Sequence, residues 1–133
     1  MMELDPIEDR EPMKIGRKTV GEVLTYRNGV KMLMVKRTVK DIVRGGKDNK
    51  MISHAMEEDL AGWPVETLLL SRMKNRGIHL LAVEVRDDKS VYVSRLSSWL
   101  DHSAIYFKRR RNGSVQRWLS FNHFVKKPGK IKL

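Results

Sequence analysis

The segment AIYFKRRRNGSVQRWLSF, residues 104–121, contains an Asn-Gly pair between two runs of strand-forming residues. Asn-Gly readily adopts positive φ at both central positions of a turn, as a two-residue hairpin requires. The segment therefore predicts a β-hairpin in which Phe107 pairs with Trp118 and Tyr106 pairs with Leu119. The base of this hairpin is apolar and its tip is basic, so we expect an arm that projects from the core and contacts a polyanion.

The positive charge of the chain is concentrated towards its C-terminal end. The formal net charge is +11 at pH 7, and residues 104–133 contain nine Lys or Arg and no Asp or Glu. The other 103 residues contain 18 basic and 16 acidic side chains. Solubility alone does not require this asymmetry, whereas attraction of phosphate groups does. The pattern favours nucleic acid as the partner, with an acidic protein or a solvated surface as the alternatives.

The expected nucleic-acid contacts are the cations of the arm and of the Lys-rich terminus, with one aromatic ring for stacking on bases. Arginine can bind phosphate bidentately, and flexible lysines suit phosphate attraction better than base reading. We expect DNA or RNA as the partner, together with protein partners in a nucleoprotein complex. The residues are Lys108, Arg109, Arg110, Arg111, Arg117, Trp118, Lys126, Lys127, Lys130 and Lys132.

Two further hairpins are predicted upstream of the arm. One spans about residues 19–37 and turns at a second Asn-Gly pair, which places Leu24 opposite Leu33 and Val23 opposite Met34. The other spans about residues 79–95, where two apolar runs flank an Asp-Asp-Lys turn. Both hairpins have apolar residues on both faces, which is typical of strands within a larger sheet.

Helical spacing of apolar residues predicts two central helices, at about residues 50–61 and 64–76. Pro64 would open the second helix, because the missing N–H of proline costs little in the first turn. A short helix is also expected over residues 96–102. With the three hairpins, these elements predict an α+β fold that has a mainly antiparallel sheet with the two central helices packed on one side.

The chain is expected to form a single α+β domain over residues 13–125. Residues 1–12 contain five acidic side chains and two prolines and predict a flexible lead-in, while residues 126–133 predict a basic tail. The sequence has no cysteine, no apolar run of about 18 residues and no basic-then-apolar signal pattern. We therefore expect a cytoplasmic protein without disulfides or a membrane segment.

A metal-dependent nuclease is the first alternative function. Glu84-Val85-Arg86 ends a predicted strand, Asp87 follows it, and Glu66 lies in the preceding predicted helix. Acidic residues at a strand end can hold Mg²⁺ through their oxygen atoms. The segment resembles the strand portion of the PD-(D/E)xK nuclease fold, with Arg86 where that family has Lys and no Pro-Asp pair before it. The alternative catalytic residues are therefore Glu66, Glu84 and Asp87, with Mg²⁺ as cofactor.

The second alternative is an assembly or adaptor protein that binds an acidic protein partner. Eight methionines and three tryptophans are compatible with an adaptable apolar interface, although the same residues suit a core. The four histidines show no spacing typical of metal ligands, so a histidine zinc site is not expected. Non-catalytic nucleic-acid binding remains the leading hypothesis, and it requires no cofactor.

Overall fold

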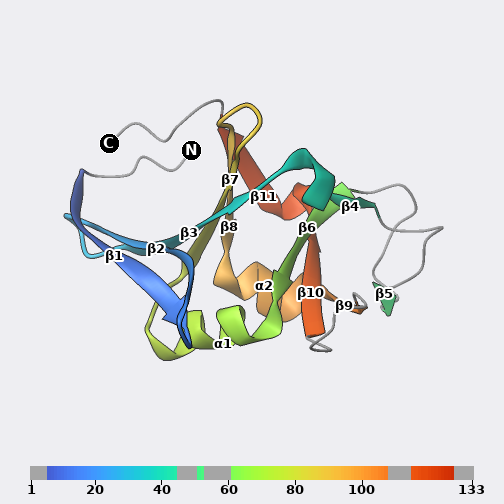
Figure 1. The fold of residues 1–133 in the computed structure, drawn as a ribbon, viewed down its shortest axis with the longest axis horizontal. Coiled ribbons are helices and arrows are strands. Elements are labelled where there is room, and N and C mark those ends of the chain that lie inside the picture. The colour runs from blue at the N-terminus through green and yellow to red at the C-terminus, as the bar shows by residue number, and fades with distance from the viewer. Residues whose placement is uncertain (1–5, 45–50, 53–60, 108–114, 128–133) are drawn as a thin grey trace.

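The computed structural model describes residues 6–44, 51–52, 61–107 and 115–127 of the 133-residue chain. These residues form two β-sheets, two α-helices and two short 3-10 helices (Figure 1). The mixed α+β class is confirmed. The predicted arrangement, in which three hairpins form one sheet with two central helices, is wrong, because the strands divide between two sheets.

The larger sheet has six strands in the order β1-β2-β3-β7-β8-β11. Neighbouring strands are antiparallel except for β3 and β7, which are parallel. Every residue of β7 is buried, as is typical of a strand covered on both faces. The strands span Ile7–Ile15 (β1), Lys18–Tyr26 (β2), Lys31–Arg37 (β3), Leu80–Val85 (β7), Val91–Arg95 (β8) and Phe124–Lys127 (β11).

The smaller sheet has five antiparallel strands in the order β4-β6-β10-β9-β5. They span Val43–Arg44 (β4), Met51–Ile52 (β5), Ala61–Glu66 (β6), Ala104–Phe107 (β9) and Val115–Ser120 (β10). The helices span Val39–Asp41 (η1), Thr67–Asn75 (α1), Leu96–His102 (α2) and Phe121–His123 (η2). Within the described ranges, no helix is long and apolar enough to cross a membrane.

The main hydrophobic core joins both sheets and both α-helices. Leu33 and Leu81 of the larger sheet belong to it together with Trp63 of the smaller sheet, Leu69 of α1 and Trp99 of α2. A second, smaller cluster lies on the other face of the larger sheet, where alternate residues of β2, β3, β7 and β8 point. Both faces of the larger sheet are therefore partly covered, which explains the apolar residues on both faces of its hairpins.

The β2–β3 hairpin forms as predicted, but its register differs by one residue. Leu24 lies opposite Met32 and Val23 lies opposite Leu33. The amide of Gly29 donates to the Tyr26 carbonyl oxygen at 2.9 Å, and Gly29 has a φ of +85°. The loop is therefore a turn with three residues and a glycine bulge, not the two-residue turn expected from Asn-Gly.

The β9–β10 pairing is also present, with a register three residues from the predicted one. Trp118 lies opposite Ala104, and Phe107 lies opposite Val115. The predicted pairing of Phe107 with Trp118 is therefore wrong. Moreover, β10 lies between β6 and β9, so the base of the arm is an interior part of a sheet. The connection over residues 108–114 lies outside the described residues.

The second hairpin, β7–β8, and the short helix α2 are confirmed. The helix predicted at 64–76 begins only at Thr67, because Pro64 belongs to β6 and pairs with Trp118. The described pairing of β6 with β4 stops at Gly62, so a proline beyond it is tolerated at an open edge. Of the helix predicted at 50–61, residues 51–52 and 61 belong to strands, and residues 53–60 lie outside the described ranges.

The expected flexible lead-in is wrong from Ile7 onwards, since these residues form strand β1. Two acidic side chains of this segment pair with cations elsewhere: Glu8 with Arg27 at 3.9 Å, and Glu11 with Arg76, the residue that follows α1. The expected basic tail likewise begins inside β11, which runs to Lys127. Strand β1 pairs with β2, the next strand along the chain, and β11 pairs with the more distant β8.

Candidate functional site

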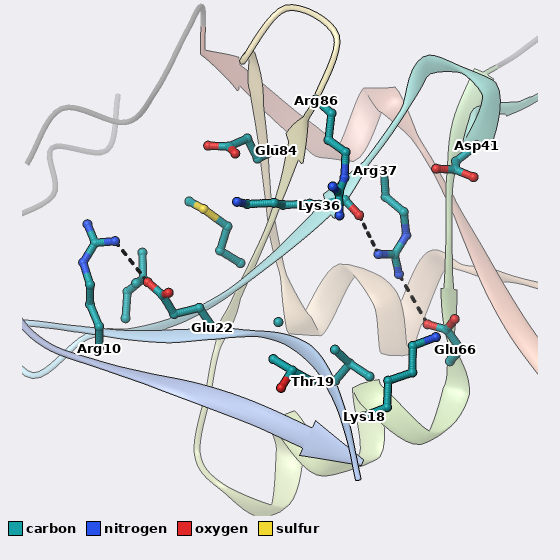
Figure 2. Close-up of a pocket in the computed structure, with 14 residues that line it drawn as sticks. Arg10, Lys18, Thr19, Glu22, Lys36, Arg37, Asp41, Glu66, Glu84 and Arg86 are labelled. Carbon is teal, nitrogen blue, oxygen red and sulfur yellow. Dashed lines mark hydrogen bonds and ion pairs between the residues drawn. The ribbon is translucent and has the colours of Figure 1, made fainter. Parts of the chain in front are cut away.

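A polar cleft of about 790 Å³ opens where β2 and β3 separate (Figure 2). The two strands pair only between Glu22 opposite Met34 and Thr25 opposite Lys31. The residues of β2 before Glu22 remain paired with β1, and the residues of β3 after Met34 remain paired with β7. The cleft lies between these two parts. Among the residues that the structure describes, the charged lining comprises five cations and four carboxylates: Arg10, Lys18, Lys36, Arg37, Arg86, Glu22, Asp41, Glu66 and Glu84.

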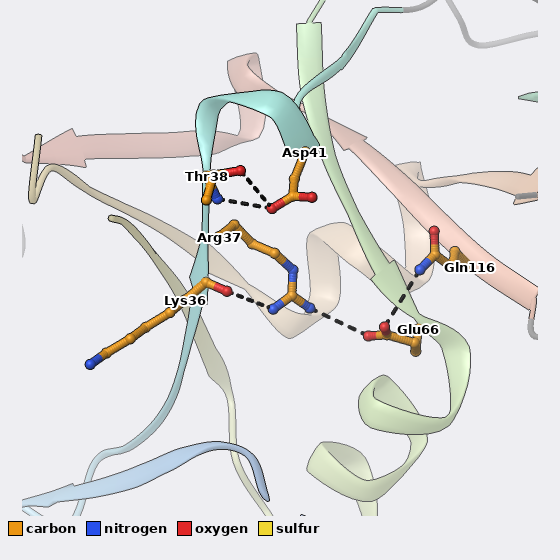
Figure 3. A network of polar contacts seen from close by, with 6 residues as sticks. All are labelled: Lys36, Arg37, Thr38, Asp41, Glu66 and Gln116. Atoms are coloured by element: carbon orange, nitrogen blue, oxygen red, sulfur yellow. Dashed lines mark hydrogen bonds and ion pairs between the residues drawn. The ribbon is translucent and has the colours of Figure 1, made fainter. Parts of the chain in front are cut away.

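One wall of the cleft is held by a polar network that links the two sheets (Figure 3). Arg37 forms an ion pair with Glu66 at 3.4 Å and donates to the Lys36 carbonyl oxygen at 2.9 Å. Gln116 of β10 donates to the other carboxylate oxygen of Glu66 at 3.5 Å. Asp41 accepts from the Thr38 amide at 2.9 Å, which closes the turn of η1. Arg37, Asp41 and Glu66 therefore have structural partners.

Four other charged side chains of the cleft have no recorded ion pair or hydrogen bond with any side chain in the described part of the protein. They are Lys18, Lys36, Glu84 and Arg86; by contrast, Arg10 and Glu22 form an ion pair at 3.0 Å. Lys36 lies opposite Glu84 in the β3–β7 pairing, and Figure 2 shows both side chains extending to the same side of these strands. Glu84 is only 7% exposed although it is charged.

The residues of the nuclease alternative do not gather at one point. Glu66 and Glu84 line the same cleft from different strands, β6 and β7. Asp87 instead accepts a hydrogen bond from the Val39 amide at 2.9 Å and so connects the β7–β8 turn to η1. Among the residues that the structure describes, no three His, Asp or Glu side chains are placed to hold a metal ion together.

Arg117 and Trp118 are engaged at the base of the arm. Arg117 is partly buried and donates from Nη2 to the carbonyl oxygen of Ser103 at 3.0 Å. Trp118 is 3% exposed, and its indole N–H donates to the carbonyl oxygen of Val43 at 2.9 Å. A ring buried to this extent has no free face for stacking on a base in this structure, and its hydrogen bond holds β10 to β4.

Lys126 and Lys127 lie on β11, the last strand of the larger sheet. The ammonium group of Lys126 lies 5.5 Å from the ring centre of Tyr92 on β8. Tyr92 stacks on Phe121 at a ring-centre distance of 4.9 Å, and Phe124 contacts both rings edge-on. All three rings are partly exposed. This group, which we call the aromatic cluster, was not predicted, although Phe121 and Phe124 lie just before the lysines of β11 in sequence.

A histidine pair lies next to the aromatic cluster. The rings of His102, at the end of α2, and His123, in η2, stack at 4.9 Å with an angle of 11° between their planes. Burial lowers the pKa of His123, and the nearby charge of His102 lowers it further. Electrostatic repulsion between the rings therefore disfavours simultaneous protonation.

The remaining predicted contacts, Lys108, Arg109, Arg110, Arg111, Lys130 and Lys132, lie outside the described residues. No protein-family model matches the chain, and the comparisons with curated proteins and with solved structures find no match. Sequence reasoning missed Lys18, Lys36 and Arg86, which become neighbours only through the pairing of β3 with β7 and the separation of β2 from β3.

Proposed function

We propose that this protein binds DNA or RNA without catalysis, through the cations of residues 104–133, here called the basic segment. The observation that carries the proposal is the charge of this segment, which has nine Lys or Arg and no Asp or Glu. Such a cluster attracts phosphate and releases counterions on binding. Because phosphate contacts dominate this type of affinity, the proposal does not require a particular base sequence.

The fold supports the proposal by giving the basic segment fixed points of attachment. Phe107 and Val115 are paired, so the connection that contains four consecutive cations starts and ends at neighbouring positions of the smaller sheet. Trp118 and Arg117 hold β10 to its neighbours through hydrogen bonds. A protein segment whose two ends are fixed loses less conformational entropy on binding a nucleic acid than a free chain end does.

The aromatic cluster gives the proposal a second contact region. Lys126 lies over Tyr92, and the partly exposed rings of Phe121 and Phe124 adjoin it. Rings next to cations suit single-stranded nucleic acid, where stacking of one base is worth about 1–3 kcal/mol. We therefore expect single strands to bind at least as tightly as duplexes of the same length.

A mobility-shift panel with single- and double-stranded DNA and RNA, with and without Mg²⁺, tests the proposal. The test variant replaces Arg109, Arg110 and Arg111 with Ala, and the control replaces the exposed cations Lys14, Arg17 and Lys74 with Ala. Both variants lose the same charge, so only a local contact distinguishes them. We expect weaker binding by the test variant and near-normal binding by the control. Equal loss in both, or strand cleavage in Mg²⁺, would contradict the proposal.

A further inference from the structure

The cleft between β2 and β3 contains charges that neither the fold nor the proposed nucleic-acid surface uses. Arg10, Glu22, Arg37, Asp41 and Glu66 are paired with protein groups. Lys18, Lys36, Arg86 and Glu84 have no recorded side-chain partner within the described ranges. Among the described residues of the basic segment, 104–107 and 115–127, none lines the cleft. The cleft is therefore a separate candidate site.

The charges of these four residues indicate the chemistry of a ligand. Three cations facing one carboxylate leave a surplus of positive charge that an anionic group would neutralise. Glu84 is 7% exposed, and a buried carboxylate without a hydrogen bond is costly unless a ligand supplies a donor. A ligand that satisfies both conditions has both an anionic group and an N–H donor.

The size and the apolar part of the lining point to an organic ligand. The volume of about 790 Å³ lies within the range of small-molecule sites, about 300–1,000 Å³, and greatly exceeds that needed by a single phosphate ion. Met34, which is half-buried, contributes apolar surface beside the charged groups. Apolar surface beside polar groups can hold the ring system of such a ligand.

We propose that the cleft binds a phosphorylated small molecule with an N–H donor, the chemical class to which mononucleotides belong. Lys36 and Arg86 contact the phosphate, and Lys18 contributes from the opposite wall. Glu84 accepts a hydrogen bond from the amino or imino group of the base, while the ring lies against Met34. The ligand is either a free mononucleotide or the phosphorylated terminal nucleotide of a strand.

Titration calorimetry with AMP, GMP, CMP and UMP, and separately with adenosine and inorganic phosphate, tests this assignment. We expect at least one mononucleotide to bind more tightly than either fragment. Lys36→Ala and Arg86→Ala each remove one charge-assisted contact and are expected to weaken mononucleotide binding about tenfold. Lys14→Ala, which removes a cation outside the cleft, should leave it unchanged. If no mononucleotide binds at millimolar concentration, or if Lys36→Ala and Arg86→Ala bind as wild type does, the assignment is wrong.

Glu84→Gln tests the contact with the N–H donor of the ligand. We expect this variant to lose affinity and selectivity among the mononucleotides while its affinity for inorganic phosphate is unchanged. Equal affinities of Glu84→Gln and wild type for every mononucleotide would remove Glu84 from the site. Thermal unfolding monitors the fold of each variant. If Glu84→Gln does not fold, the Lys36→Ala and Arg86→Ala variants still test the site, because both side chains are exposed.

Competition with oligonucleotides distinguishes a free mononucleotide from the terminal nucleotide of a strand. A variant of the basic segment distinguishes the cleft from the proposed nucleic-acid surface. If the ligand is a strand terminus, a 5′-phosphorylated oligonucleotide should compete with the mononucleotide, whereas its dephosphorylated form should not. If it is a free mononucleotide, neither oligonucleotide should compete. The variant with Arg109, Arg110 and Arg111 replaced by Ala should bind mononucleotides normally. Loss of mononucleotide binding in that variant would contradict a separate site, whatever its effect on long nucleic acids.

Discussion

Lys36 and Glu84 are direct partners in the parallel pairing of β3 with β7, and their side chains extend to the same face of the sheet. They nevertheless form no recorded ion pair, while Glu84 is 7% exposed. A nearly buried carboxylate that lacks a close partner lowers the free energy of unfolding. The cleft therefore carries a stability cost of the kind that binding sites commonly impose on a fold.

Glu84→Gln should raise the free energy of unfolding of the ligand-free protein by about 0.5–1 kcal/mol, because it removes a poorly solvated charge and conserves the shape of the side chain. Urea denaturation measures the change. Glu22→Gln is the control, since its ion pair with Arg10 is largely exposed and should contribute little. A loss of more than about 1 kcal/mol for Glu84→Gln would show that its charge is stabilising.

Gly62→Ala should destabilise the protein by about 3 kcal/mol or more, or prevent folding. A Cβ atom at Gly62 would lie 2.2 Å from the carbonyl oxygen of Leu119 and 2.7 Å from an indole carbon of Trp118. Backbone on the facing strand cannot retreat without breaking the β6–β10 pairing. Gly29→Ala is the comparison, because its surroundings are open and only its positive φ is strained, which should cost about 1 kcal/mol. Equal effects in urea denaturation would contradict the close approach.

Trp118→Phe should lower the free energy of unfolding by about 1–3 kcal/mol and leave nucleic-acid affinity unchanged. The substitution removes the donor to the Val43 carbonyl oxygen and leaves a small void in the buried sheet. Urea denaturation and a mobility shift measure the two effects separately. A variant with normal stability and reduced affinity would place Trp118 in the interface, as first expected from its sequence.

The histidine pair predicts a pH effect. Because the pKa of His123 in the folded protein is below its ordinary value of 6.5, the unfolded chain binds more protons than the folded one between these two values. His123 should therefore not reduce the free energy of unfolding above pH 6.5. Below pH 6.5, the free energy of unfolding should decrease as the pH falls towards the lowered pKa. His102→Asn removes the neighbouring charge, so the pKa of His123 should rise but stay below 6.5 because of burial. Proton NMR titration measures it; an unchanged pKa would exclude the coupling.

Local sequence signals identified the hairpins and α2, but they did not determine how these elements assemble. Asn28-Gly29 signalled the turn correctly, and the pairing still moved by one residue because Gly29 forms a bulge. Pro64 is typical of a helix start, but the helix begins only at Thr67. Its pairing opposite Trp118, 54 positions along the chain, keeps it in a strand instead. Interactions between distant segments therefore overrode good local signals.

The basic segment and the cleft also differ in whether the sequence alone could reveal them. The charge of the basic segment is visible in the sequence, because it depends only on composition. The cleft is not visible, because Lys36 and Glu84 are brought together by a parallel pairing and Lys18 by the separation of β2 from β3. Burial likewise decided the role of Trp118, whose indole N–H meets the backbone of Val43.

The salt dependence of nucleic-acid binding tests the central claim most directly. The measurement is the slope of the logarithm of the association constant against the logarithm of salt concentration, for wild type and for the Arg109, Arg110 and Arg111 to Ala variant. Each phosphate contact contributes about 0.7–0.9 to this slope, so the variant should show a slope shallower by up to about 2–3. An unchanged slope, with wild-type affinity, would show that these arginines do not contact phosphate.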